Sequence, residues 1–217
     1  MANSAKFPSG FFWGTATSAT QVEGHVQNEW TDFVARDGNH CRVACDHYHR
    51  YPEDVAWMTR LGVNAYRMGI EWSRLQPSPG APLDRKELVR YIDLLDRLKA
   101  AAITPMVVLH HFSNPPWINA AGGWTNPATI DAFVSYVAQL VPLLRDRVSL
   151  WNTFNEPDTY ASLGYLLGDF PPCRKGDWFG FRKVVRHMAA AHLRASKIIR
   201  EAGLKNQPVG VDRKSVV

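Results

Sequence analysis

Segments typical of β-strands alternate with amphipathic helical segments along the chain, and this alternation constrains the fold more than any other feature. Four apolar segments read as strands, at 11–19, 65–72, 103–110 and 149–156. Each precedes a segment with helical periodicity, at 51–61, 84–101, 126–144 and 179–202. Because strand–helix alternation implies a parallel sheet with right-handed crossovers, the sequence predicts an α/β fold. A fifth strand begins at 208–211.

The length of 217 residues suits one domain, and the 46% hydrophobic share is that of a globular protein. We find no interdomain linker and no internal repeat. The sequence therefore predicts a single domain over 1–217, with irregular tails at 1–6 and 212–217.

Charge and composition exclude several classes of function. The net charge is +5, and the 25 Lys and Arg residues are scattered among 20 Asp and Glu, which argues against nucleic-acid binding. The sequence has no run of 18 apolar residues, so no membrane span is expected. The first residues lack the apolar core of a signal peptide. Three cysteines, an odd number, fit a reducing cytoplasm, so we expect a cytoplasmic protein.

The fourth strand ends in a candidate acid/base group. The run Ser149 to Pro157 begins as a strand and finishes in Asn155-Glu156-Pro157. Pro157 has no N–H and restricts the residue before it, so regular structure is expected to stop at Glu156. A carboxylate at the tip of a parallel strand is held in position by the strand and faces a ligand.

Three other strands carry polar residues near their carboxyl ends. Gln21 follows the first strand, Arg67 and Glu71 lie in the second, and His111 ends the third. In a parallel α/β sheet these ends meet at one rim, where ligands bind. The sequence therefore predicts one site that combines them with Asn155 and Glu156, although rim groups that only bind neighbouring loops would give the same pattern.

Six motifs of this chain resemble, in the same order, those of glycoside hydrolase family 1, the β-glucosidases and their relatives. The resemblance covers about 7–211. The motifs are Phe7-Pro8 through Gln21-Val22-Glu23-Gly24; Asp46-His47-Tyr48-His49-Arg50-Tyr51 with Glu53-Asp54; Tyr66-Arg67 with Glu71-Trp72-Ser73-Arg74; Leu109-His110-His111; Gly122-Gly123-Trp124; and Thr153-Phe154-Asn155-Glu156-Pro157.

The resemblance implies a role for each residue of the predicted site. Glu156 would be the general acid/base, and Asn155 would hydrogen-bond the 2-hydroxyl of the sugar. Gln21 and His111 would bind other hydroxyls, and Trp124 would line the same pocket. Arg67 would pair with the nucleophilic carboxylate. The substrate would be a β-linked glucoside or oligosaccharide, and neither a cofactor nor a metal is expected.

The chain resembles only the N-terminal half of that family. The family fold is a (β/α)8 barrel whose nucleophile is a Glu on the seventh strand, whereas this chain matches four βα units and the start of a fifth strand. The expected architecture is therefore a (β/α)4 half-barrel without the nucleophile. Glu71 and Glu23 are weaker candidates for a substitute carboxylate. Retaining hydrolysis needs two carboxyl groups roughly 5–5.5 Å apart.

Two alternatives to an active hydrolase remain open at this point. One is an inactive sugar-binding half-barrel, and the other is a fragment that needs a complementary C-terminal half. Because four strands leave two open edges and an apolar inner face, we expect a homo-oligomer or a complementary partner.

One segment has residues that could bind a metal ion. Cys41-x3-Cys45-x-His47-x-His49 has the residue types of a zinc site, but its spacing is tighter than the usual paired-ligand patterns. The family resemblance assigns this segment to a structural loop, so a metal is not expected there.

Overall fold

The computed structural model describes residues 6–202 and 207–212. Its centre is a parallel sheet whose strands follow one another in chain order. The strands are β1 (Gly14–Thr17), β2 (Ala65–Gly69), β3 (Thr104–Val108), β4 (Leu150–Asn152) and β5 (Val209–Gly210). The predicted α/β fold, with four βα units and the start of a fifth strand, is confirmed.

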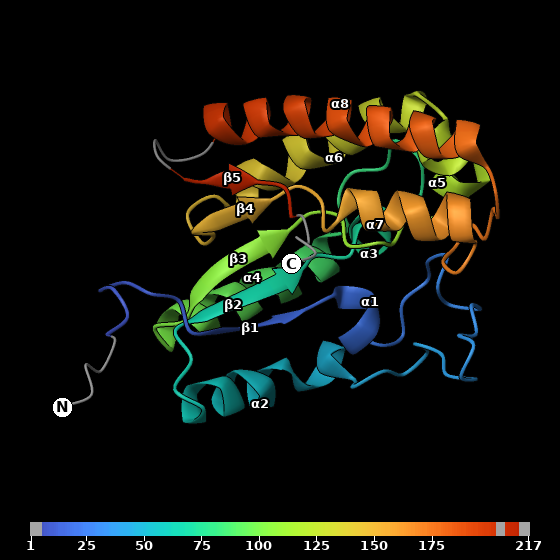
Figure 1. Ribbon diagram of the computed structural model, residues 1–217. Coiled ribbons are helices and arrows are strands. Elements are labelled where there is room, and N and C mark those ends of the chain that lie inside the picture. The colour runs from blue at the N-terminus through green and yellow to red at the C-terminus, as the bar shows by residue number, and fades with distance from the viewer. Residues whose placement is uncertain (1–5, 203–206, 213–217) are drawn as a thin grey trace.

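Four long helices connect these strands and lie along one side of the sheet (Figure 1). They are α2 (His47–Arg60), α4 (Arg85–Ala100), α6 (Ala128–Leu144) and α8 (Trp178–Ala202). Short helices gather where the strands end: α1 (Ala19–Val22), α3 (Trp72–Leu75), α5 (Pro116–Ala120), η1 (Gly123–Thr125), α7 (Pro157–Ala161) and η2 (Ser162–Leu167). Among the described residues no helix has the length and apolarity needed to cross a membrane.

The long helices form where a helical repeat of apolar residues coincides with a residue that can cap the helix end, and α4 is an example. In α4 the side chain of Asp84 accepts hydrogen bonds from the backbone N–H groups of Lys86 (2.8 Å) and Glu87 (3.0 Å), which satisfies two free donors of the first turn. Tyr91, Leu95 and other apolar residues of the same face are fully buried. The core lies between these helix faces and the sheet.

Several predicted elements have different bounds in the structure, among them the fourth strand, which ends at Asn152 and not at 156. The first strand is limited to Gly14–Thr17, and Phe11, Phe12 and Trp13, expected to be buried, are 39%, 50% and 52% exposed. Phe11 and Trp13 pack against each other, at 4.9 Å between ring centroids, and not against the core. Helix α2 begins at His47 and not at 51, because the buried His47 ring replaces an apolar residue in the first turn.

The sheet is open at both ends in the described chain. β1 pairs only with β2, and β5 pairs only with β4. The inner face next to β5 holds a depression of about 450 Å³. The residues that line it are Arg67, Met106, Leu150, Trp151, Asn152, Pro208, Val209, Gly210, Val211 and Asp212. The arrangement is that of half a barrel, with the long helices on one side and the other side uncovered (Figure 1).

Candidate active site

Arg67 lies at the centre of the groups that the strand ends bring together. Its Nη2 donates a hydrogen bond to Oδ1 of Asn155 at 2.7 Å and contacts Oδ2 of Asp212 at 3.1 Å. Burial lowers the pKa of Arg67, while the negative charges of Asp212 and Glu156 act in the opposite direction. The guanidinium therefore joins β2 to the residues that follow β4 and β5.

Glu156 occupies a strained position between β4 and α7. Its backbone is left-handed, with φ 38° and ψ 62°, a conformation that residues other than glycine seldom adopt. Pro157 begins the helix directly after it, whereas strand β4 already ends at Asn152, earlier than the predicted end at Glu156. The carboxylate is half-buried, and its negative charge acts to raise the pKa of Arg67. Strain of this kind persists where the surroundings over-determine the backbone, and functional sites are such places.

Gln21 and His111 line one pocket of about 140 Å³. Gln21 lies in α1, and its Oε1 accepts a hydrogen bond from Ser18 Oγ at 2.9 Å. The remaining walls are Ser18, Thr20, Trp30, Cys41, Phe112 and Phe170. An amide, an imidazole and three aromatic rings in one small pocket suit a ligand with hydroxyl groups and flat apolar faces.

His111 is held in the neutral form. Burial lowers its pKa to about 3, and the nearby positive charge of Arg67 contributes in the same direction. Its Nδ1 is buried and has no hydrogen-bond partner among the described residues. A neutral imidazole with an unused ring nitrogen can accept or donate one hydrogen bond to a hydroxyl group. Because the charge of Arg67 affects the pKa of His111, this pocket lies near the group formed by Arg67, Asn155 and Asp212.

Trp124 does not line that pocket, and the expectation that it lines the sugar site stays a prediction. Its ring is fully buried, and Nε1 donates to Oδ1 of Asn114 at 2.9 Å. Two left-handed glycines, Gly122 (φ 102°) and Gly123 (φ 60°), precede it and turn the chain towards the core. Oδ1 of Asn114 also contacts His110 Nε2, and its Nδ2 donates to Glu29 and to the hydroxyl group of Tyr160. Trp124 is therefore part of a buried hydrogen-bond network behind the rim.

Sequence reasoning missed Phe112, Trp30 and Phe170 as pocket walls. Phe112 directly follows His111 and has φ 65°, and its carbonyl accepts a hydrogen bond from Trp30 Nε1 at 2.7 Å. Because Phe112 directly follows His111, its place in the sequence could have predicted that it lines the same pocket. Trp30 and Phe170 lie in loops, whose positions cannot be predicted from a helical or strand periodicity.

The two substitute carboxylates considered from the sequence are both buried and fully engaged. Glu71 accepts hydrogen bonds from the hydroxyl groups of Thr20 (3.0 Å), Ser73 (2.8 Å) and Ser113 (2.9 Å). Glu23 pairs with Arg74 at 2.7 Å and Arg90 at 2.8 Å, and both its partners are buried as well.

These contacts indicate a structural role for Glu71 and Glu23, and neither carboxylate is free to face a ligand. Asp212, expected in an irregular tail, is the carboxylate that contacts Arg67.

Residues 41–49 do not bring their cysteines and histidines together into one zinc site. Cys41 lines the pocket of Gln21, whereas Cys45 lines a different cavity together with His47. The Nδ1 atom of His47 lies 2.6 Å from Asp54 Oδ2, and His49 contacts Asp46. All three cysteines are free.

Comparison with known proteins places the chain among glycosidases. The profile of glycosyl hydrolase family 1 matches residues 3–215. Beta-glucosidase A of Thermotoga maritima is 36% identical over 220 residues, which is 96% of this chain and 49% of that protein. The chain therefore spans about half the length of the curated relatives it matches.

Solved structures give the same result for the fold. A family 1 β-glucosidase from Thermotoga maritima has a TM-score of 0.91 at 35% identity, covering 97% of this chain and 49% of that one. The Thermotoga maritima β-glucosidase in complex with deoxynojirimycin has a TM-score of 0.89 at 35% identity, covering 95% and 49%.

Proposed function

The chain belongs to glycosyl hydrolase family 1, and we propose that it supplies the acid/base half of a β-glucosidase active site. The observation that carries this proposal is the position of Glu156, at a strained strand-to-helix junction beside Asn155 and Arg67. The substrate class is a β-linked glucoside or oligosaccharide, the reaction is hydrolysis with retention, and the chain's own residues need no cofactor for these steps.

Each residue of the site has a chemical task in this proposal. The carboxyl group of Glu156 protonates the glycosidic oxygen as the bond breaks and later takes a proton from the water that attacks the sugar. Asn155 binds the 2-hydroxyl, and its amide is oriented by the hydrogen bond from Arg67 to Oδ1. Gln21 and the neutral His111 bind other hydroxyls in their shared pocket.

The second carboxylate of a retaining site must come from outside the described residues. Glu71 and Glu23 are enclosed by hydrogen bonds, and Asp212 faces Arg67 through its own ion pair. In the family, the nucleophile lies in the half of the barrel that this chain does not match. We therefore propose that hydrolysis requires a complementary C-terminal half, whose nucleophile would take up the Arg67 contact.

The open surfaces support a complementary partner. An apolar groove of about 300 Å³ lies between α7 and α8 and is continuous with the end of β5. Its walls include Phe154, Val185, Met188 and Val211. A further βα unit would cover this groove and pair with the free edge of β5.

The test is hydrolysis of 4-nitrophenyl β-D-glucoside by this chain mixed with the C-terminal half of the Thermotoga maritima enzyme. We expect the mixture to hydrolyse the substrate and Glu156→Gln to lower its rate by roughly 10²-fold or more, since the amide cannot donate the proton. Glu201→Gln, an exposed carboxylate at the end of α8, is the matched control and should retain the parent rate.

Two outcomes would contradict the proposal. One is a Glu156→Gln mixture as active as the parent mixture. The other is an absence of hydrolysis although the two halves co-elute as a complex.

A second candidate function is sugar binding without turnover, favoured by the pocket of Gln21 and His111. The pocket belongs entirely to the described chain and contains aromatic rings beside polar groups. Glucose or deoxynojirimycin should then raise the melting temperature of the chain alone, and His111→Ala should abolish the shift. A melting temperature that neither sugar changes would exclude this candidate.

A further inference from the structure

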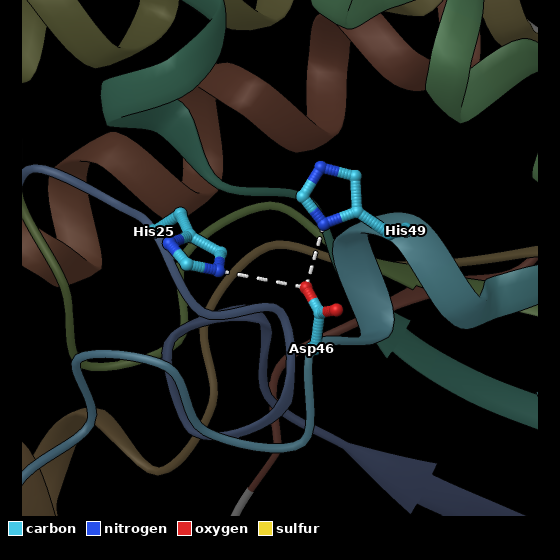
Figure 2. A group of neighbouring side chains, drawn as sticks. All are labelled: His25, Asp46 and His49. Atoms are coloured by element: carbon cyan, nitrogen blue, oxygen red, sulfur yellow. Dashed lines mark hydrogen bonds and ion pairs between the residues drawn. The ribbon is translucent and has the colours of Figure 1, made fainter.

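A second polar cluster lies outside the pocket of Gln21 and His111, where the turn after α1 meets the first residues of α2. It consists of His25, Asp46 and His49 (Figure 2). One potential ligand atom of each residue lies within 4.8 Å of those of the other two. The sequence alone does not suggest this set, because His25 is distant in sequence from the other two residues.

The Asp46 carboxylate joins the two imidazoles. Its Oδ1 lies 2.7 Å from Nδ1 of His49 and 3.6 Å from Nε2 of His25. Figure 2 shows both rings turned towards this oxygen. Asp46 stands at the N-cap position of α2 but makes no side-chain cap bond, since its backbone is left-handed with φ 52°. The carboxylate is therefore directed to the histidines and not to the helix.

We propose that His25, Asp46 and His49 form a binding site for a divalent transition-metal ion of the Zn²⁺ type. Two imidazoles and one carboxylate are ligands that Zn²⁺ accepts, whereas Mg²⁺ and Ca²⁺ prefer oxygen ligands alone. Three protein ligands leave a fourth position for water, as in zinc sites that are open to solvent.

The distances require only small movements. Zinc–ligand bonds of about 2.0–2.2 Å in a tetrahedral arrangement place the ligand atoms about 3.4 Å from one another. The separation of 3.6 Å between His25 and Asp46 already meets this value, and the hydrogen bond of 2.7 Å between His49 and Asp46 must lengthen. The imidazole side chains are 50% and 61% exposed, so they can rotate without disturbing the core.

The tautomer of His49 must change when the ion binds. In the ion-free protein, the proton on Nδ1 donates to Asp46. Coordination through Nδ1 places that proton on Nε2 by exchange with solvent, so the imidazole stays neutral. The ion then replaces the proton between the nitrogen and the carboxylate.

The backbone that carries His25 is held in place. Arg74 donates to the carbonyls of both Gly24 and His25, and the N–H of His25 donates to the carbonyl of Arg42 at 2.7 Å. A Cβ on Gly24 would lie 1.9 Å from the carbonyl oxygen of Val43, so the backbone of this turn packs closely against the backbone of Val43. A backbone that is already held in place lowers the entropic cost of binding an ion.

Neighbouring cations are neutralised by other carboxylates. Arg74 pairs with Glu23 at 2.7 Å, and Arg50, which feels the charge of Asp46, pairs with Glu53 at 2.9 Å. The negative charge of Asp46 therefore remains to offset the charge of the ion.

An ion at this position would close the long loop between α1 and α2. That loop carries Trp30 and Cys41, two walls of the pocket of Gln21 and His111. Because the ion binds the folded protein and joins both ends of the loop, it should stabilise the fold and reduce the mobility of these walls.

The test is calorimetric titration of the tag-free chain with Zn²⁺, together with melting curves in Zn²⁺ and in EDTA. We expect one ion per chain, a higher melting temperature with Zn²⁺, and at least tenfold weaker binding in His25→Asn. His25 has a left-handed backbone, with φ 52°, which asparagine tolerates, so the variant should keep the parent melting temperature in EDTA. His49→Gln provides a second variant within a helix, with the same expected loss.

Two controls separate this site from other histidines and thiols. His40→Asn changes an exposed histidine of the same loop and should bind like the parent. The double variant Cys41→Ser/Cys45→Ser should also keep its affinity. Co²⁺ should give the visible bands of a nitrogen–oxygen site without thiolate charge transfer.

The proposal is overturned if His25→Asn and His49→Gln bind Zn²⁺ as tightly as the parent. It is also overturned if the cysteine variant, and not the histidine variants, loses binding.

Discussion

The Glu29 carboxyl group is buried beside the network that lies behind the rim. Its Oε1 accepts a hydrogen bond from Asn114 Nδ2 at 2.7 Å, while Oε2 has no hydrogen-bond partner among the described residues. Burial raises the pKa of Glu29 to about 8, and the charge of Glu71 contributes in the same direction. In the folded protein Glu29 is therefore protonated at neutral pH.

This protonation makes the free energy of unfolding depend on pH. The unfolded chain releases the Glu29 proton above about pH 4.5, whereas the folded chain keeps it until about pH 8. The stability that the Glu29 proton contributes is fully present below about pH 4.5 and is lost as the pH rises to about 8. Over this range the free energy of unfolding falls by on the order of 1 kcal/mol per pH unit. Glu29→Gln should flatten this slope, because the amide does not titrate.

Urea denaturation between pH 5 and pH 8 measures this effect. Glu201→Gln, which changes an exposed carboxylate, should leave the parent slope unchanged. Equal slopes for Glu29→Gln and the parent would show that Glu29 is not the titrating group.

At the residue scale, sequence reasoning reached the groups that directly follow strands. Asn155, Glu156 and His111 lie in the turns shortly after β4 and β3, because the apolar runs before them fix the positions of those strands. It did not anticipate the full burial of Trp124, which follows two left-handed glycines, or the contact of Asp212 with Arg67, which is distant in sequence. Contacts of this second kind arise from the topology, and no local pattern encodes them.

Helix α4 offers a direct test at the scale of one element. Asp84→Ala removes the two hydrogen bonds to the first turn and should lower the free energy of unfolding by about 1 kcal/mol. Asp84→Asn keeps an oxygen acceptor and should retain most of the stability. Chemical denaturation of the three proteins measures both effects, and an Asp84→Ala variant as stable as the parent would contradict the capping role.

The longer elements were predictable and the shorter ones were not. Residues 84–101 and 179–202 have an apolar period that extends over several turns, and the structure has helices there. The short helices at the strand ends contain three to six residues each, too few for a period to show. They form because the chain must turn sharply at the rim, and they include the helix that carries Gln21.

For the whole molecule, the open edges of β1 and β5 and the groove beside α8 predict association. We expect the chain alone to sediment as a dimer or larger species, because free strand edges and an uncovered apolar groove favour pairing. Adding the C-terminal half of a family 1 enzyme should convert it to a one-to-one complex. A monodisperse monomer in sedimentation velocity would contradict this expectation.

Val185 allows the groove itself to be tested. It lines the groove and is 38% exposed, so Val185→Lys should weaken association without a large loss of stability. Leu193 on the same helix is 69% exposed and does not line the groove, so Leu193→Lys is the matched control. Equal sedimentation of the two variants would exclude the groove as the contact surface.

The strand order has a consequence for how the chain acquires its structure. Since each strand pairs with the strand that precedes it in the chain, every new βα unit finds its docking surface already built. Such a chain can fold progressively from its N-terminus while it leaves the ribosome, without waiting for distant segments. The unpaired edge of β5 would then be the growing end of that process, ready to receive the next strand (Figure 1).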